Sequence, residues 1–160
     1  MYKLLFDSDA LIKSAKSQIL EKIIGEFDIL ITGEVYQETV EEGKKRLYED
    51  AEKIGTLVKE NKIKLIKAAK NIPLREKILG KGEASVFRAY KKNIIIVTDD
   101  VSFSSFLKDK NANVLSSAHM INILLKRKKI NKIQALQHLD KLSPFIRNEL
   151  YDLIKNEIGE

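Results

Sequence analysis

Carboxylates stand directly behind two apolar runs of the sequence. LLFD ends at Asp7, and IIIVTDD ends in the adjacent pair Asp99 and Asp100. The run Ile94–Val97 has no polar alternation, which is typical of a strand that is buried on both faces. One aspartate could cap the next helix, but two adjacent carboxylates repel each other and gain little from burial. The pair therefore favours a functional explanation.

Two glutamates follow other segments of the chain. Glu38 lies in VYQE, shortly after the apolar run Phe27–Thr32, and Glu83 follows Gly82 in GKGEAS. Each alone has an ordinary explanation, because glutamates are common on solvent-facing helices and in the first turn of a helix. Together with the three aspartates they form a set of carboxylates that would crowd only if a cation neutralises them. Carboxylate oxygens favour Mg²⁺ or Mn²⁺ over zinc, and the chain has no cysteine.

The segments around these acids alternate between strand and helix patterns. We predict strands at residues 2–7, 27–32, 62–66, 94–97 and 112–116, with 62–66 at an edge of the sheet. We predict helices at residues 10–24 with a break near Ser17, at 33–42, 47–58, 82–92, 102–109, 118–125 and 133–142, and helix starts near Pro73 and at Ser143. This alternation predicts an α/β sandwich with a parallel sheet. Sites in such sheets form at the carboxyl ends of strands, where Asp99 and Asp100 stand.

Helical spacing also indicates which side chains face the core. The 47–58 helix has an apolar stripe that begins at Leu47 and continues through Ala51, Ile54 and Val58. The 133–142 helix has a second stripe that begins at Ile133. Each stripe is typical of the core-facing side of an amphipathic helix.

Length and composition limit the class of protein. A chain of 160 residues with 44% hydrophobic residues suggests one domain with a real core. No apolar stretch approaches the roughly 20 residues that span a bilayer, and Asp7 and Asp9 interrupt the first apolar run, so we expect neither a signal peptide nor a membrane anchor. The absence of cysteine fits a reducing compartment. We therefore expect a soluble, cytoplasmic protein.

The net charge of +6 is unevenly distributed along the chain. Residues 59–81 contain eight basic and two acidic residues, and residues 126–132 contain five basic residues and no acid. Such patches can contact phosphates, although a lysine-rich solvated face is the simpler explanation. There is no tryptophan, and no aromatic stripe is spaced for base stacking.

Four short motifs in this order resemble those of PIN-domain proteins. They are LLFDSDALI, VYQE, GKGEAS and VTDDVSF, and the last contains a Thr-x-Asp-x-x-Phe pattern at Thr98, Asp100 and Phe103. The Gly-Glu pair and the doubled final aspartate resemble the branch of the family whose third acid is a glutamate. The resemblance covers the order of elements from Tyr2 to about Leu125.

The resemblance implies a three-layer α/β/α sandwich and Mg²⁺- or Mn²⁺-dependent cleavage of RNA phosphodiester bonds. The implied catalytic acids are Asp7, Glu38, Glu83 and Asp100, with Asp7, Glu83, Asp99 and Asp100 as metal ligands and Ser8 and Thr98 in support. One or two ions would polarise the scissile phosphate and help to generate a hydroxide nucleophile, so no histidine base is needed. The family also suggests the toxin of a toxin–antitoxin pair.

The substrate of such an enzyme would be single-stranded or looped RNA. We expect the basic patches to hold its flanking phosphates, in particular at Lys126, Arg127, Lys128 and Lys129. Two regions exceed the minimal family pattern, namely the segment 41–73 and the tail 131–160. Each could cover the pocket, bind an antitoxin, form a homodimer interface or belong to the core of a single domain spanning 1–160.

Three alternatives stay open at this point. FDSDAL resembles the opening of haloacid-dehalogenase-like phosphatases, with Asp7 as nucleophile and Asp9 as general acid, but Leu11 stands where Thr or Val is usual. A PIN-like domain could bind RNA or protein without cutting it. Finally, the acids could be helix caps only, each contributing about 1 kcal/mol to stability.

Overall fold

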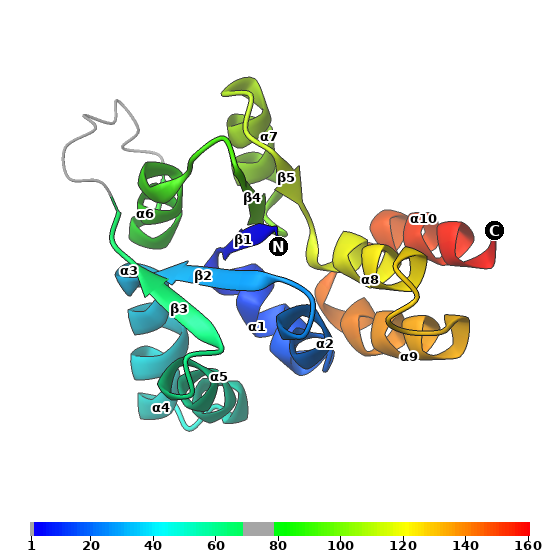
Figure 1. Ribbon diagram of the computed structural model, residues 1–160, viewed down its shortest axis with the longest axis horizontal. Coiled ribbons are helices and arrows are strands. Elements are labelled where there is room, and N and C mark those ends of the chain that lie inside the picture. Colours follow the sequence, from blue (N-terminus) through cyan, green and yellow to red (C-terminus); the bar gives the residue numbers. More distant parts are fainter. Residues whose placement is uncertain (1, 69–78) are drawn as a thin grey trace.

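A parallel sheet forms the centre of the protein, as seen in a computed structural model that describes residues 2–68 and 79–160. Within these residues the strands have the order β3-β2-β1-β4-β5, and every pair is parallel (Figure 1). Their bounds are β1 (Lys3–Phe6), β2 (Asp28–Thr32), β3 (Ile63–Ile66), β4 (Ile94–Val97) and β5 (Val114–Leu115). All five predicted strands are therefore confirmed.

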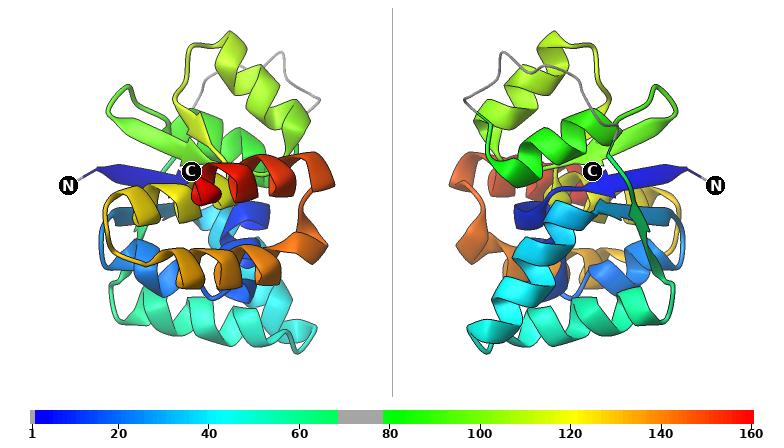
Figure 2. Two further views of the ribbon diagram at one scale, coloured as in Figure 1. Left: turned by 90° about the vertical axis from the view of Figure 1, so that its right-hand side faces the viewer. Right: turned by 90° about the vertical axis from the view of Figure 1, so that its left-hand side faces the viewer.

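Helices cover both faces of this sheet. Their bounds are α1 (Ser8–Lys16), α2 (Leu20–Ile24), α3 (Gly33–Tyr36), α4 (Glu42–Lys45), α5 (Glu49–Lys59), α6 (Lys81–Ala89), α7 (Val101–Asp109), α8 (Ser117–Lys126), α9 (Lys132–Leu142) and α10 (Asn148–Gly159), with a π-helical turn η1 (Gln37–Glu41) and a 3₁₀ turn η2 (Ser143–Phe145). Helices α6 and α7 lie on one face, and α1, α2 and α5 lie on the other (Figures 1 and 2). The predicted three-layer α/β/α fold is confirmed.

The strand order creates a switch point beside the central strand. The chain runs from β1 through β2 to β3 on one side, then crosses to β4 and β5 on the other. Connections therefore leave the carboxyl ends of β1 and β4 in opposite directions, which opens a crevice between them. Leu4, Leu5 and Phe6 of β1 are fully buried and hold this centre of the sheet rigid.

The predicted break in the first helix is confirmed. Helix α1 ends at Lys16, and α2 begins at Leu20. Between them Gln18 has a φ of 62°, a left-handed conformation that no α-helix can contain. The buried side chains of Ile19 and Leu20 then continue the packing against the sheet.

Three sequence predictions at helix ends are wrong. Leu47 is 90% exposed and has a φ of 59°, because it forms the turn before α5 rather than its first residue. Ile133 is 69% exposed, because the capping box of Asn131 with Gln134 sets a helix start at which Ile133 faces solvent. Ser143 ends α9 and begins only the short 3₁₀ turn η2, because the helix that carries Leu150 and Ile154 begins at Asn148.

Both regions beyond the minimal family pattern contribute to the core. Ala51, Ile54 and Leu57 of α5 are buried, and β3 forms an edge of the sheet. In the tail, α9 and α10 pack against α8 and bury side chains such as Leu139 and Ile154. The helix start expected near Pro73 lies outside the described residues.

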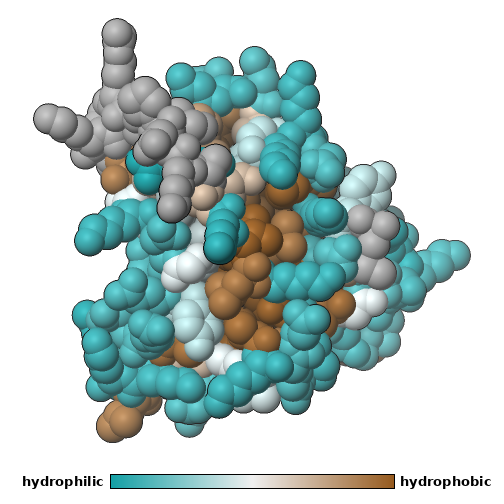
Figure 3. Space-filling model, turned by 60° about the vertical axis from the view of Figure 1, so that its left-hand side comes forward, coloured by the Kyte–Doolittle hydropathy of each residue, from teal (hydrophilic) through white to brown (hydrophobic). Residues whose placement is uncertain are grey.

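The surface is mixed in polarity. On the face shown in Figure 3, an apolar band lies between hydrophilic margins. Within residues 2–68 and 79–160, no helix is long and apolar enough to cross a bilayer.

Candidate functional site

Asp7 and Thr98 meet at the switch point of the sheet. Asp7 is only 4% exposed and caps α1, because its carboxylate accepts a hydrogen bond of 2.9 Å from the Ala10 N–H. Its other carboxylate oxygen accepts a hydrogen bond from the hydroxyl of Thr98, which follows β4. Thr98 also accepts a hydrogen bond of 3.2 Å from the Asp100 N–H. The first strand and the fourth strand are thus joined through one buried carboxylate.

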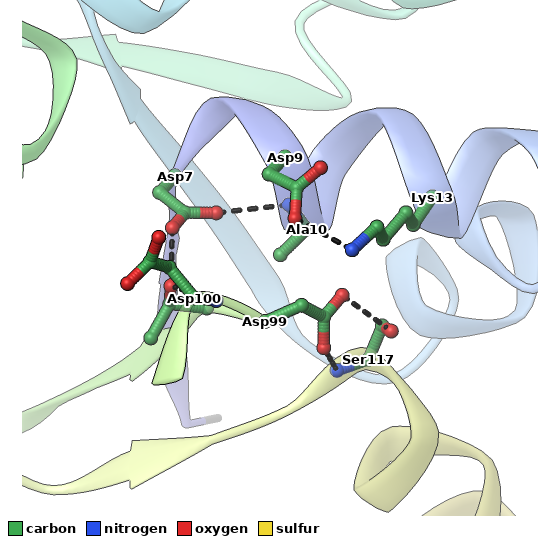
Figure 4. A network of polar contacts seen from close by, with 8 residues as sticks. Asp7, Asp9, Ala10, Lys13, Asp99, Asp100 and Ser117 are labelled. Carbon is green, nitrogen blue, oxygen red and sulfur yellow. Dashed lines mark hydrogen bonds and ion pairs between the residues drawn. The ribbon is translucent and has the colours of Figure 1, made fainter. Parts of the chain in front are cut away.

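The doubled aspartate after β4 divides between two helices. Asp99 accepts hydrogen bonds from the N–H and the hydroxyl of Ser117, at 2.9 and 2.7 Å, and so holds the start of α8 (Figure 4). Asp100 caps α7 by accepting a hydrogen bond of 2.7 Å from the Phe103 N–H. Both residues therefore stabilise the start of a helix. These contacts explain how the strand can end in two adjacent acids.

Glu38 reaches this edge from a π-helical turn. The turn η1 interrupts an otherwise continuous helix between α3 and α4, and such turns often occur at functional sites. The Ser8 hydroxyl donates a hydrogen bond to the Glu38 carboxylate. On its other side, that carboxylate lies against Gly82, where a Cβ would stand 2.7 Å from Oε1 and 2.8 Å from Oε2. Only glycine at position 82 leaves room for Glu38 in this position.

A buried hydrogen-bond network fixes α6 beside β2. Thr32, the last residue of β2, shares a hydrogen bond of 2.6 Å with Ser85, whose hydroxyl also donates to the Gly82 carbonyl at 2.6 Å. Thr32 and Ser85 are almost completely buried, so this contact is shielded from water. The first turn of α6, which carries Glu83, is thereby held next to Glu38.

Burial raises the pKa of several of these carboxyl groups. The pKa of Asp7 rises to about 7, mainly because burial disfavours its charged form, and the hydrogen bond from Thr98 offsets this only in part. Burial also raises the pKa of Asp99 against the lowering effect of its hydrogen bonds from Ser117. The pKa of Glu83 is raised by burial and then by the negative charges of Asp100 and Glu38. The site therefore holds negative charge that the protein compensates incompletely.

These acids form two groups. We call Asp7 and Asp99 the inner acids, because each is held by two hydrogen bonds beneath the edge of the sheet. We call Glu38, Glu83 and Asp100 the outer acids, which lie nearer to solvent. Within residues 2–68 and 79–160, no three acidic or histidine side chains lie in an arrangement that could hold a metal ion. The predicted residues thus share one edge of the sheet without forming a single cluster.

The donor set suits a hard divalent cation. Every side chain of the two groups offers carboxylate oxygens, and Ser8 and Thr98 add hydroxyl groups at the same edge. Oxygen donors of this kind match Mg²⁺ or Mn²⁺. A cation here would also offset the cost of burying the Asp7 charge. The chemistry of the donors therefore fits such an ion, and the outer acids would have to turn toward Asp7 to surround it.

The basic residues predicted to hold RNA lie elsewhere. Lys126 is the last residue of α8, and Arg127, Lys128 and Lys129 follow it. The Arg127 guanidinium lies 5.0 Å from the centre of the Phe27 ring, and Lys129 pairs with Glu26 at 2.9 Å. Both partners come just before β2, at the amino ends of the strands. The fold therefore does not bring these cations to the acidic edge.

Comparison with known proteins decides the family. A family model described as a PIN domain matches residues 3–160. The chain belongs to the PIN-domain family. PIN domains are generally nucleases that use divalent metal ions, and the match includes α9 and α10. No curated protein and no solved structure matches the chain. Membership in the PIN-domain family also leaves no support for the haloacid-dehalogenase-like alternative.

Several residues that shape this PIN-domain site escaped the sequence analysis. Gly82 was quoted only as the neighbour of Glu83, although its missing side chain makes room for Glu38. Ser117 and Ser85 were not identified at all, because a serine near a helix start is too common to be a signal. The contact of Asp9 with Lys13, an ion pair of 2.7 Å one helical turn apart, could have been found from the i,i+4 spacing.

Proposed function

We propose that this PIN domain is a ribonuclease that cleaves RNA phosphodiester bonds with the help of Mg²⁺ or Mn²⁺. The observation that carries the proposal is the convergence of inner and outer acids from four separate segments at the switch point of the sheet. Burial that raises the pKa of Asp7 to about 7 supports the need for a positive partner. A fold without a use for this charge would gain stability by replacing it.

The cation-holding residues in this proposal are Asp7, Glu83, Asp99 and Asp100. A bound divalent cation would supply polarisation of the scissile phosphate and activation of the attacking water. The outer acids supply the adaptable part of the site, because their partial exposure lets their side chains turn toward Asp7. Asp7 itself stays in place, since Ala10 and Thr98 hold both of its oxygens.

The remaining residues of the site position these acids. The Ser8 hydroxyl orients Glu38, and the Thr98 hydroxyl orients Asp7. The contact of Thr32 with Ser85 sets the distance between β2 and the first turn of α6. Hydrogen-bonded partners of metal ligands typically change affinity or activity by about 10- to 100-fold when removed, so we assign these hydroxyl groups a supporting role.

A second candidate function is a PIN domain that binds RNA without cutting it. One observation favours it: Asp7 and Asp100 cap helices, Asp99 anchors α8, and Glu83 accepts a hydrogen bond of 3.4 Å from the Gly80 N–H at the start of α6. Four acids would then be explained by helix stability alone. Retained RNA binding without cleavage in the presence of Mn²⁺ would support this candidate.

Cleavage of a labelled, partly single-stranded RNA tests the proposal. Wild-type protein is incubated with Mn²⁺, Mg²⁺ or EDTA beside the variants Asp7→Asn and Asp100→Asn. Asp109→Asn serves as the matched control, because Asp109 is an exposed residue at the end of α7, the helix that Asp100 caps. We expect cation-dependent cleavage, at least about 100-fold slower in both site variants and unchanged in the control. Folded wild type that never cleaves RNA would contradict the proposal.

The role of a toxin in a toxin–antitoxin pair is a further part of the proposal, and it is supported only by the resemblance to the family. Induced expression should then arrest growth of a host cell, and Asp7→Asn should not. Co-expression of the product of the neighbouring gene should restore growth. Unimpaired growth with active nuclease would remove this part of the proposal and leave the ribonuclease activity intact.

A further inference from the structure

A cleft of about 740 Å³ opens beside the acidic edge of the sheet. Asp99, Asp100 and Val101 line one side, and residues of the segment 144–150, from η2 into α10, line the other. Its volume lies in the usual range for a bound small molecule or a single nucleotide. Because the cleft shares Asp99 and Asp100 with the acidic edge, a polymer held at these acids would continue into it.

An aromatic side chain stands in the wall formed by the C-terminal segment. Phe145 is 38% exposed and lines the cleft, so part of its ring is open to a ligand there. The Lys16 ammonium lies 5.0 Å from the centre of its ring, so α1 fixes the position of the turn η2. A nucleic-acid base can stack on such a ring whatever its identity.

The charges in the cleft are mixed. Lys13 is paired with Asp9 at 2.7 Å, and Glu149 adds a fourth carboxylate to those of Asp9, Asp99 and Asp100. Arg147 is exposed and forms no ion pair within the part of the chain that the structure describes. Arg147 is thus the guanidinium available to a ligand, and guanidinium groups match phosphate geometry.

We propose that this cleft binds the nucleotide next to the cleaved bond of a single-stranded RNA, with its base against Phe145 and its phosphate against Arg147. The proposal rests on the ribonuclease function above and assigns it a substrate subsite. A single strand is required, because bases in a duplex are already paired and stacked and cannot lie on a protein ring. The acids in the cleft make long-range attraction weak, so stacking on Phe145 should contribute most of the affinity.

Binding and cleavage of a short labelled oligonucleotide test this subsite separately from the chemistry. Binding is measured by fluorescence anisotropy in EDTA, where no cation-dependent cleavage interferes, for a single strand and for a hairpin stem. The variants are Phe145→Leu, which keeps an apolar side chain, and Arg147→Gln. The controls are Tyr48→Leu and Arg46→Gln, which remove an exposed aromatic and an exposed guanidinium at the α4–α5 turn.

We expect Phe145→Leu to weaken binding of the single strand by about 5- to 100-fold. Arg147→Gln should weaken it less and lower the salt dependence by about one phosphate contact. In Mn²⁺ both variants should raise KM and leave kcat nearly unchanged, since they remove binding that ground state and transition state share. The melting temperatures of both variants and their affinity for the hairpin stem should change little. The two control variants should bind the single strand as wild type does.

Two results would overturn the subsite. One is an affinity for the single strand that equals that of wild type in both cleft variants. The other is a loss of affinity in the control variants as large as that in the cleft variants. If RNA is cleaved while the cleft variants bind normally, the nuclease proposal stands and the subsite fails. If RNA is never cleaved while Phe145→Leu and Arg147→Gln still lose affinity, the subsite stands and the nuclease proposal fails.

Discussion

The inner and outer acids lie at the same edge of the sheet but differ in burial and in how firmly the protein holds them. Asp7 and Asp99 are held by hydrogen bonds from the protein, and burial raises the pKa of each. Glu38 and Asp100 are exposed. Glu38 accepts a hydrogen bond from the Ser8 hydroxyl, and Asp100 accepts one from the Phe103 N–H. The inner acids therefore provide fixed positions at a cost in stability, and the exposed outer acids Glu38 and Asp100 provide mobility at little cost. Glu83 lies between the two cases, because it is half-buried and burial raises its pKa.

This difference suggests how a PIN domain can remain folded without its cation. Charges that are buried deeply must have hydrogen-bond partners, or the domain would unfold. Carboxylates near the surface are solvated by water and need no partner from the protein. A site assembled from both kinds needs only small side-chain rotations to gather around an ion, while its backbone stays fixed by the strands β1 and β4.

The largest expected effect concerns the free energy of unfolding and its dependence on pH. The pKa of Asp7 is about 7 in the folded protein and near 3.8 in the unfolded chain, so its contribution to stability is fully present below about pH 4 and is lost as the pH rises through 7. Without divalent cations, Asp7→Asn should therefore be more stable than wild type at about pH 8, by between about 1 and 4 kcal/mol. Chemical denaturation at several pH values measures this difference.

Asp100→Asn is the matched comparison for this effect. Asp100 is exposed, and asparagine keeps the ability to cap α7, so stability should change by less than about 0.5 kcal/mol. Subtracting the Asp7→Asn curve from the wild-type curve removes the titrations of Glu83 and His119, whose pKa shifts have other causes. Asp99 is coupled to Asp7 by charge, so the difference contains the mutual effect of these two acids. Equal stability of wild type and Asp7→Asn at every pH would refute the distinction between inner and outer acids.

A smaller effect is expected when an outer acid is displaced without being removed. Gly82→Ala places a Cβ 2.7 Å from the present position of Glu38 Oε1, so the flexible carboxylate must move. Helix α6 should form as well as before or better, since alanine favours helix over glycine by up to about 1 kcal/mol. Cleavage of the labelled RNA should fall by about 10-fold while the melting temperature stays equal or rises. Full activity in this variant would show that the position of Glu38 does not matter.

Removal of the Ser8 hydroxyl should have a still smaller effect. Ser8→Ala leaves every acid in the chain and removes only the hydrogen bond to Glu38. We expect cleavage to slow by less than about 10-fold, with a higher Mn²⁺ concentration needed for half-maximal rate. Ser8→Thr, which keeps a hydroxyl, should restore most of the activity. If neither variant differs from wild type, Glu38 needs no positioning partner.

The smallest effect is expected at Asp9. Its carboxylate is half-exposed and pairs with Lys13 on the surface of α1, outside both groups of acids. Asp9→Asn should change the free energy of unfolding by no more than about 0.5 kcal/mol and the cleavage rate by less than about threefold. A loss of activity comparable to that of Asp7→Asn would place Asp9 among the catalytic acids.

The fold was largely predictable because its strands are continuous apolar runs. A segment such as Ile94–Val97 has few alternatives to a buried strand, and the alternation with helices then favours a parallel sheet. Helix ends were less predictable. Leu47, Ile133 and Ser143 were misplaced because caps and left-handed residues set the helix ends, and apolar spacing does not show them. Helix α5 begins two residues after Leu47, α9 begins one residue before Ile133, and Ser143 begins a 3₁₀ turn.

The position of the acids at one edge of the sheet was predictable, and the contacts that hold them there were not. Acids at strand ends can be read from the sequence, so Asp7, Asp99 and Asp100 were found from their positions. That Asp99 would be held by Ser117 and Glu38 by Ser8 depends on contacts between segments 18 and 30 residues apart. The sequence also could not show how far the basic residues 126–129 lie from the acids. That distance depends on the three-dimensional fold.

The most direct test of the central claim, that these carboxylates bind a divalent cation, is a calorimetric titration of Mn²⁺ in the absence of RNA. Wild type, Asp7→Asn and the control Asp109→Asn are compared at about pH 8, where the Asp7 carboxyl group is mostly ionised. We predict saturable binding to wild type and to the control, and an affinity at least about 10-fold lower for Asp7→Asn. Indistinguishable titrations of wild type and Asp7→Asn, or no binding to folded wild type, would contradict the account.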